Sequence, residues 1–142
     1  MLECSLKMPS YETMQVFLSY DRADEAFAKA LSTELTKQGL SVWRDEEELL
    51  PGDNWALQIG EALKRSKAMV VLVSPESMRS KWVRHEIEYA LGDLRYESRL
   101  FPVLIRPTDE VPWILRELNM LSARQGAAKI SQSIADALKQ VA

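Results

Sequence analysis

A chain of 142 residues fits one ordinary domain, and its 46% content of hydrophobic residues is typical of a protein that buries a core. The formal net charge of −3 argues against a general nucleic-acid binder, because such proteins usually carry a basic patch. A single cysteine, Cys4, and a single histidine, His85, exclude an internal disulfide and cysteine or multi-histidine metal cages, and they argue against a Ser-His-Asp hydrolase.

The sequence also predicts a cytoplasmic protein without a membrane anchor. No stretch of the chain approaches the roughly 20 apolar residues that are needed to span a bilayer. The N-terminus lacks the apolar core of a signal peptide. We therefore expect residues 1–13 to form a leader segment and residues 14–142 to form one folded domain.

Short apolar runs alternate with helical patterns from the start of this domain. Gln15–Ser19 is a strand pattern, and apolar residues spaced four apart predict a helix from about Asp24 to Gln38. We expect Asp24 to be the N-cap of this helix and Gly39 to be the left-handed residue after its end. Leu40–Trp43 is then a short second strand.

The middle of the chain carries a long acidic loop and a strongly apolar strand. The loop covers residues 45–53, and a helix with Trp55, Ile59 and Leu63 follows it. The run Ala68–Val73 shows almost no alternation of apolar and polar residues, which predicts a central strand buried on both faces.

The second half continues the same alternation. A helix with Ser80 as its N-cap is expected to bury a stripe of Val83, Ile87 and Leu91. The remaining elements are expected in this order: a strand over Leu100–Ile105, a loop with one helical turn over Pro107–Leu118, a weak strand over Asn119–Leu121, and a closing helix with Ile130, Ile134, Ala137 and Leu138.

Five strands that alternate with helices predict an α/β fold of the flavodoxin-like, doubly wound type, a five-stranded parallel sheet with helices on both faces. With the strand order 2-1-3-4-5, a crevice opens where strands 1 and 3 end, because the connections leave these two ends in opposite directions. The segments after Ser19 and after Val73 are therefore the first places to look for a site.

Three boxes of the sequence resemble those of the TIR (Toll/interleukin-1 receptor) family. Residues 16–20 (VFLSY) resemble the first TIR box, and Asp45 through 49–52 (LLPG) resembles the loop after strand 2. Ser74-Pro75, followed by residues 80–86 (SKWVRHE), resembles the Ser-x-Trp-x-x-x-Glu pattern of TIR domains that cleave NAD. The resemblance covers about residues 14 to 141 and predicts a TIR domain of the bacterial NAD-cleaving type.

The resemblance implies an NAD+ glycohydrolase, or an ADP-ribosyl cyclase, with NAD+ as its substrate and with no cofactor or metal. It implies activation by self-assembly, a sensor domain or protein as a further partner, and a role in bacterial defence against phage. Glu86 is the implied catalytic residue, and the loop residues Leu49, Leu50, Pro51 and Gly52 are the implied assembly contacts. The side chains that we expect to bind substrate are Trp82, Tyr20, Arg22, Asp45, Ser74 and Trp55. An enzymatic relative active in axon degeneration has an acidic residue where this chain has Leu50, which puts substrate contacts from that position in doubt.

One carboxylate is enough for this chemistry. Trp82 and Glu86 are four residues apart and share a helix face, which we expect to border the crevice, while the apolar stripe packs on the sheet. Nicotinamide leaves NAD as a neutral ring, so its departure needs no general acid, unlike the leaving group of an ordinary glycosidase. A single carboxylate can bind the ribose hydroxyls and stabilise the positive charge at the anomeric carbon.

Simpler interpretations stay open for each of these residues. Glu86 is otherwise a solvated helix charge, and Trp82 is otherwise a partly buried core residue. Tyr20 otherwise packs under the loop, and Arg22 is otherwise a surface or cap residue. His85 points about 100° away from Glu86 around the helix, which predicts a surface residue.

The alternative function is a non-enzymatic TIR–TIR interaction module for signalling assembly. A phospho-receiver shares the expected architecture, but it needs an aspartate at the end of strand 3, where this chain has Val73-Ser74. A dinucleotide-binding dehydrogenase is disfavoured because no Gly-x-Gly-x-x-Gly follows a strand.

Overall fold

The computed structural model describes residues 14–44 and 54–141. The expected leader over residues 1–13 lies outside the described residues, and so does the loop over residues 45–53. The predictions for Asp45, Leu49, Leu50, Pro51 and Gly52 therefore stay predictions.

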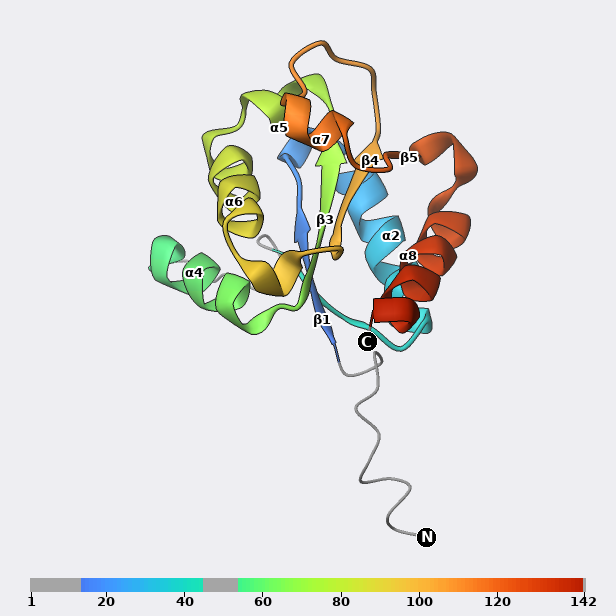
Figure 1. Ribbon diagram of the computed structural model, residues 1–142. Coiled ribbons are helices and arrows are strands. Elements are labelled where there is room, and N and C mark those ends of the chain that lie inside the picture. The colour runs from blue at the N-terminus through green and yellow to red at the C-terminus, as the bar shows by residue number, and fades with distance from the viewer. Residues whose placement is uncertain (1–13, 45–53, 142) are drawn as a thin grey trace, which may run out of the picture.

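Five parallel strands form one sheet in the order β2-β1-β3-β4-β5, which confirms the predicted architecture (Figure 1). The strands are β1 (Gln15–Ser19), β2 (Ser41–Trp43), β3 (Ala68–Val73), β4 (Leu100–Leu104) and β5 (Leu121–Ser122). β5 is only two residues long and pairs with only the last two residues of β4. Because all strands run in one direction, their carboxyl ends meet at one edge of the sheet, and this edge carries the connections that follow β1 and β3.

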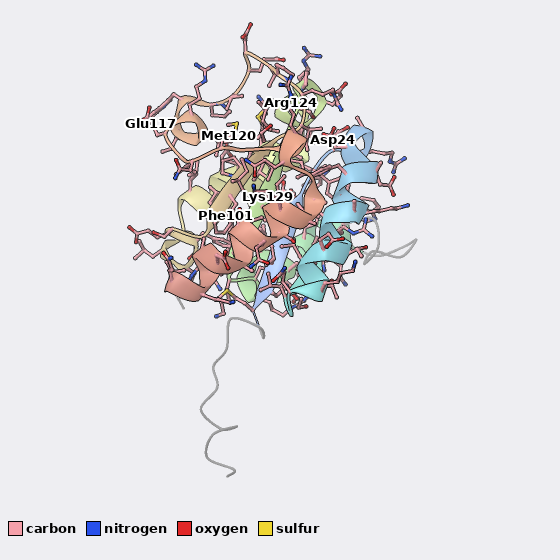
Figure 2. The ribbon with its side chains drawn as sticks, turned by 90° about the vertical axis from the view of Figure 1, so that its right-hand side faces the viewer. Asp24, Phe101, Glu117, Met120, Arg124 and Lys129 are labelled. Carbon is pink, nitrogen blue, oxygen red and sulfur yellow. The ribbon has the colours of Figure 1, made fainter. Side chains whose placement is uncertain are left out.

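Helices cover both faces of the sheet (Figures 1 and 2). α2 (Glu25–Lys37) and α8 (Ala127–Val141) lie side by side on one face. α4 (Trp55–Arg65) and α6 (Lys81–Leu91) lie on the other. The shorter helices are α5 (Pro75–Arg79), α7 (Trp113–Arg116), η2 (Arg22–Asp24), η3 (Leu94–Tyr96) and η4 (Ala123–Gln125). None of the helices in residues 14–44 and 54–141 is long and apolar enough to cross a membrane.

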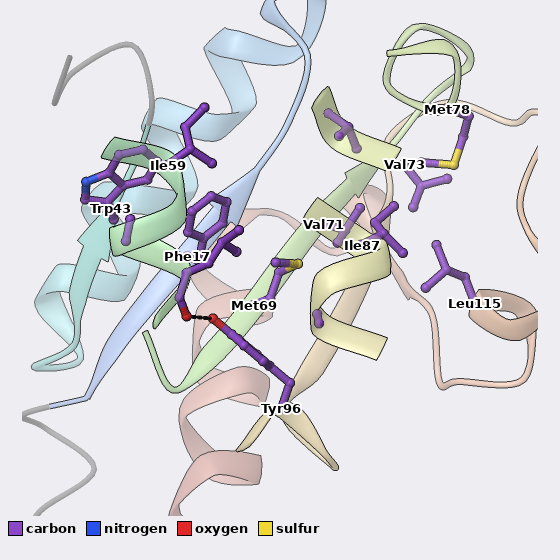
Figure 3. Packing of buried hydrophobic residues seen from close by; sticks show 14 of the residues in the cluster. Phe17, Trp43, Ile59, Met69, Val71, Val73, Met78, Ile87, Tyr96 and Leu115 are labelled. Atoms are coloured by element: carbon purple, nitrogen blue, oxygen red, sulfur yellow. Dashed lines mark hydrogen bonds between the residues drawn. The ribbon is translucent and has the colours of Figure 1, made fainter. Parts of the chain in front are cut away.

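Two buried clusters, one on each face, hold the layers together. On the α4/α6 face, Phe17 stacks on Trp43 with ring centroids 5.0 Å apart, and Ile59 and Met69 belong to the same cluster (Figure 3). On the α2/α8 face, alternate residues of the same strands pack against the two helices. All six residues of β3 are buried, as its unbroken apolar run predicts for a strand covered on both sides.

Several local predictions are confirmed. β1 and β3 have the predicted bounds, and Ser80 caps α6 by accepting a hydrogen bond from the Val83 N–H. Gly39 follows α2 with a φ of 93°, the left-handed conformation that glycine adopts at little cost. His85 is exposed, and its ring lies 6.3 Å from the ring of Trp82.

Other local predictions are wrong. Leu91 is 42% exposed, and Ala90 is buried in its place. The fifth strand lies at Leu121–Ser122 instead of Asn119–Leu121. α5 was not expected at all, although Ser74-Pro75 is a good helix start, with a capping side chain followed by a proline.

A polar cluster fastens η3 to the end of α4 and to α6. Arg95 donates hydrogen bonds to both carboxylate oxygens of Asp93, to Tyr89 Oη and to the Lys64 carbonyl. Tyr96 donates its hydroxyl to the Leu63 carbonyl at 2.6 Å, and burial raises the pKa of this phenol (Figure 3). The hydrogen bonds from Arg95 lower the pKa of the Asp93 carboxyl from 3.8 to about 2.

We predict that Asp93 contributes stability that acid removes. A folded-state pKa below the unfolded-state value favours the folded protein above about pH 4, and this contribution is lost as the pH falls from 3.8 to about 2. Asp93→Asn keeps the cap of η3 and removes the charge, so the free energy of unfolding should fall less steeply in the variant over this range. Urea unfolding at a series of pH values measures the difference, with the exposed Asp109→Asn as the control. Parallel pH profiles for wild type and Asp93→Asn would contradict the prediction.

Candidate functional site

Glu86 is a buried carboxylate at the carboxyl edge of the sheet. Its side chain belongs to α6 and is only 2% exposed. Ser19, the last residue of β1, donates its hydroxyl to Glu86 Oε1 at 2.6 Å. A charge inside a protein is costly unless polar groups bind it, so the hydroxyl at the strand end helps to compensate for the burial of the carboxylate.

Helix geometry explains why Glu86 is buried. At about 100° per residue, Glu86 falls on the same arc of α6 as Val83, Ile87 and Ala90, all of which face the sheet. Trp82 and Leu91 lie at the two margins of this arc, which is why each is nearly half exposed. The expectation that Glu86 faces an open crevice on a surface separate from the apolar stripe is therefore wrong: the carboxylate is within the buried arc.

Two exposed tryptophans lie at the beginnings of the helices on this face. Trp82 in the first turn of α6 and Trp55 in the first turn of α4 are each 47% exposed. Both helices begin on the side of the sheet where the strands end, because each returns the chain to the start of a strand. Trp82 precedes Glu86 by one helical turn, so its flat apolar ring lies at the protein surface, at the margin of the arc that buries the carboxylate.

Tyr20 and Arg22 follow β1 but take different positions from Glu86. Tyr20 packs against the cluster on the α2/α8 face, whereas Ser19 and Glu86 belong to the α4/α6 side. Arg44, only 5% exposed, donates to the Tyr20 hydroxyl at 3.4 Å. Arg22 is exposed in η2. Their contacts with a substrate stay predictions.

Ser74 is fully buried, and its hydroxyl forms hydrogen bonds within the protein. Its hydroxyl accepts a hydrogen bond from the Ser77 N–H, which caps α5, and donates to Asp24 Oδ2 at 2.5 Å. Asp24 sits at the N-cap position of α2 as predicted, but its side chain makes no capping bond there. Its carboxylate instead lies 3.0 Å from Arg106 Nη1, and Arg106 also binds Glu76. A substrate contact from Ser74 stays a prediction.

Sequence reasoning assigned no contact within the site to four residues at this edge: Ser19, Asp24, Arg44 and Arg106. The alternation of β1 places Ser19 on the same face as Phe17, so the strand pattern contained a signal for Ser19. Arg44 directly follows the last residue of β2, Trp43, so its position after a strand end also contained a signal. The pairing of Asp24 with Arg106 joins residues far apart in the chain and left no signal in the local sequence.

The arrangement suits the stabilisation of a developing positive charge. A carboxylate shielded from bulk water acts more strongly on a nearby cation than one in solvent does. The exposed indole of Trp82, one helical turn away, offers a surface for stacking an aromatic ring or a cationic sugar. The described residues around Glu86 thus supply a carboxylate, a hydroxyl that orients it and an aromatic surface.

The sequence profile of the TIR domain family matches residues 16–140, nearly the whole chain. The chain belongs to the TIR family. Its sheet order, with strand 2 at one edge and strand 5 at the other, is that of the flavodoxin-like TIR fold.

Curated relatives of this TIR domain include proteins named for reactions of NAD. A probable 2' cyclic ADP-D-ribose synthase, TcpO of Methanobrevibacter olleyae, is 32% identical over 63% of this chain and 26% of its own length. The NAD(+) hydrolase TcpC of Escherichia coli O6:H1 is 27% identical over 58% of this chain and 27% of its own length. The matched part of the chain thus spans about a quarter of the length of these relatives.

A solved TIR structure shares the fold. The TIR domain of the Toll-related receptor TRR-2 from Hydra magnipapillata superposes with a TM-score of 0.71 at 20% identity, covering 89% of this chain and 99% of that one.

We predict that Ser19 stabilises this TIR domain through its bond to Glu86. Ser19→Ala removes the hydroxyl donor from a buried carboxylate and should lower the free energy of unfolding by about 1–3 kcal/mol. Ser41→Ala, at an exposed serine of β2, should change it by less than about 0.5 kcal/mol. Urea unfolding at neutral pH measures both. In a Glu86→Leu background the Ser19→Ala cost should shrink, and an unchanged cost there would show that the hydroxyl acts elsewhere.

Proposed function

We propose that this TIR domain cleaves the bond between nicotinamide and ribose in NAD+, with Glu86 as the catalytic residue. The observation that carries the proposal is the buried Glu86 carboxylate, oriented by Ser19, with the exposed indole of Trp82 one helical turn earlier on α6. The names of TcpO and TcpC support the same chemistry, since TcpO is named a probable 2' cyclic ADP-D-ribose synthase and TcpC an NAD(+) hydrolase.

The reaction asks little of the protein beyond charge stabilisation. As the bond breaks, its electron pair leaves with nicotinamide, which becomes neutral, and positive charge develops on the ribose. The Glu86 carboxylate, which is only 2% exposed in this structure, stabilises that charge once the ribose is admitted to the edge of the sheet beside it. Trp82 and Trp55 provide surfaces for the nicotinamide or adenine ring. Attack by water at the anomeric carbon gives ADP-ribose and releases a proton. Attack by a hydroxyl or ring nitrogen of the same molecule gives a cyclic ADP-ribose, which contains one water fewer.

Glu86→Gln should abolish this activity without unfolding the domain. The amide is nearly the same size and can still accept the hydrogen bond from Ser19, but it carries no charge, so kcat should fall at least about a hundredfold. Glu88→Gln is the matched control, because Glu88 is an exposed carboxylate on the same helix. The measurement is nicotinamide release from NAD+ resolved by chromatography, with circular dichroism to verify folding. Undiminished release by a folded Glu86→Gln variant would remove Glu86 from the mechanism.

A non-enzymatic TIR–TIR interaction module is the second candidate function, and one surface favours association. A cavity of about 340 Å³ is lined by apolar residues that include Leu91, Leu94, Ile114 and Leu118. Trp113, next to Ile114, is 71% exposed, and Leu94 is 85% exposed. Exposed aromatic and apolar side chains around a cavity are typical of protein interfaces.

Self-association, a sensor domain or protein as a partner, and a role in bacterial defence against phage are further parts of the function that we propose.

We predict that NAD+ cleavage per mole of protein rises with protein concentration, because association follows mass action. Trp113→Ala should weaken the rise by removing an apolar contact, whereas Leu57→Ala, at an exposed leucine of α4, should leave it intact. Turnover across a wide dilution series, with light scattering in parallel, measures both. Constant turnover from a persistent monomer would rule out activation by assembly. Association without any cleavage would favour the interaction module.

A further inference from the structure

A protein carboxylate occupies the point where doubly wound sheets usually bind their ligands. The chain segments after β1 and β3 diverge at this edge of the sheet, and in this fold class the resulting crevice is the usual ligand site. Here Asp24, which ends the segment after β1, reaches Ser74 at the end of β3. The Asp24 side chain is fully buried. Figure 2 shows Asp24 at the start of α2, beside the edge where the strands end.

Each oxygen of this carboxylate faces a polar partner, Oδ2 through a hydrogen bond and Oδ1 through an ion pair. Ser74 donates to Oδ2 at 2.5 Å, and the Arg106 guanidinium lies 3.0 Å from Oδ1. An aspartate at an N-cap position usually accepts a hydrogen bond from its own helix, but Asp24 makes no such bond. Its carboxylate is therefore used for long-range contacts with the segments that follow β3 and β4.

The same two chain segments are joined a second time at the candidate site. Residues 19–24 follow β1, and residues 74–86 lead from β3 into α6. Ser19 binds Glu86 at one end of this pair of segments, and Asp24 binds Ser74 at the other. Together with the intervening chain, these two buried hydrogen bonds close a ring. With a single bond the segments could turn about it, whereas two bonds fix their relative orientation.

We propose that Asp24 is a positioning residue for the reaction at Glu86: its bonds to Ser74 and Arg106 hold the segment after β1 against the start of α5 and so keep Ser19 and Glu86 aligned. The role in turnover rests on the proposed function of Glu86. Asp24 itself touches no substrate and acts through the two segments that it joins.

Asp24→Asn is the decisive variant. The amide keeps the size of the side chain and can accept a hydrogen bond from Ser74, but it loses the charge that faces Arg106. Misalignment of a catalytic group costs rate more than binding, so kcat should fall about ten- to a hundredfold while KM stays within about twofold. Glu76→Gln is the matched control, since Glu76 is an exposed carboxylate on the same guanidinium. Its kcat should stay within about twofold of wild type.

Coupling between the two bonds gives a second readout. If Asp24 and Ser19 act through one alignment, the losses of kcat in Asp24→Asn and Ser19→Ala should be less than additive in free energy in the double variant. A purely structural role for Asp24 predicts a lower melting temperature with unchanged kcat for the folded fraction. That result, or full additivity, would overturn the proposal.

Amide hydrogen exchange tests the alignment without any enzymatic assay. In Asp24→Asn, exchange should become faster in residues 19–24 and in the first turn of α6, and it should be unchanged in α8. If the wild type releases no nicotinamide, the proposed function fails. Unchanged exchange in Asp24→Asn would separately refute the positioning role of Asp24. Should Asp24→Asn fail to fold, Arg106→Gln removes only the guanidinium that pairs with Asp24. The same local increase in exchange is then expected.

Discussion

The hydrogen bond between Ser19 and Glu86 is the interaction on which the candidate site depends. It joins the end of a central strand to a helix that packs on the sheet, and it does so inside the protein. A buried carboxylate is costly without a polar partner, so this bond favours the rotational setting of α6 that brings Glu86 to Ser19. The rest of the edge is arranged around this setting, including the exposed indole of Trp82 one turn earlier on the same helix.

The two faces of β1 divide the polar residues at this edge into separate groups. Ser19 belongs with Glu86 on the α4/α6 side, while Tyr20 belongs with Arg44 on the α2/α8 side. Adjacent residues of a strand point to opposite faces, so neighbours in a sequence motif do not have to serve the same site. Asp24 belongs to a third group, in which it bridges the segments that leave β1 and β3.

The sequence predicted the sheet well because its central strands are strongly apolar. The bounds of β1 and β3 follow from their hydrophobic runs, and the alternation of strands and helices predicts the parallel, doubly wound sheet. The strand order is the one expected for the flavodoxin-like fold of the family that the boxes resemble. The burial of Glu86 was missed because a charged residue within a helix is usually placed toward solvent, although its position on the buried arc can be read from the spacing. The pairing of Asp24 with Arg106 could not be predicted, since it depends on how segments distant in sequence meet in the folded chain.

The short β5 has a consequence for how copies of this protein can gather. β5 covers only the end of β4, so within the described chain the outer edge of β4 before Val103 has no partner strand. The Arg99 carbonyl and the Ile105 N–H both bond toward β3, so Pro102, at an alternate position, faces that outer edge. Proline has no N–H, and a foreign strand aligned there would find a donor missing from the ladder. At high local concentration of the protein, cross-β aggregation along this edge is therefore less favourable than it would be with an N–H donor at position 102.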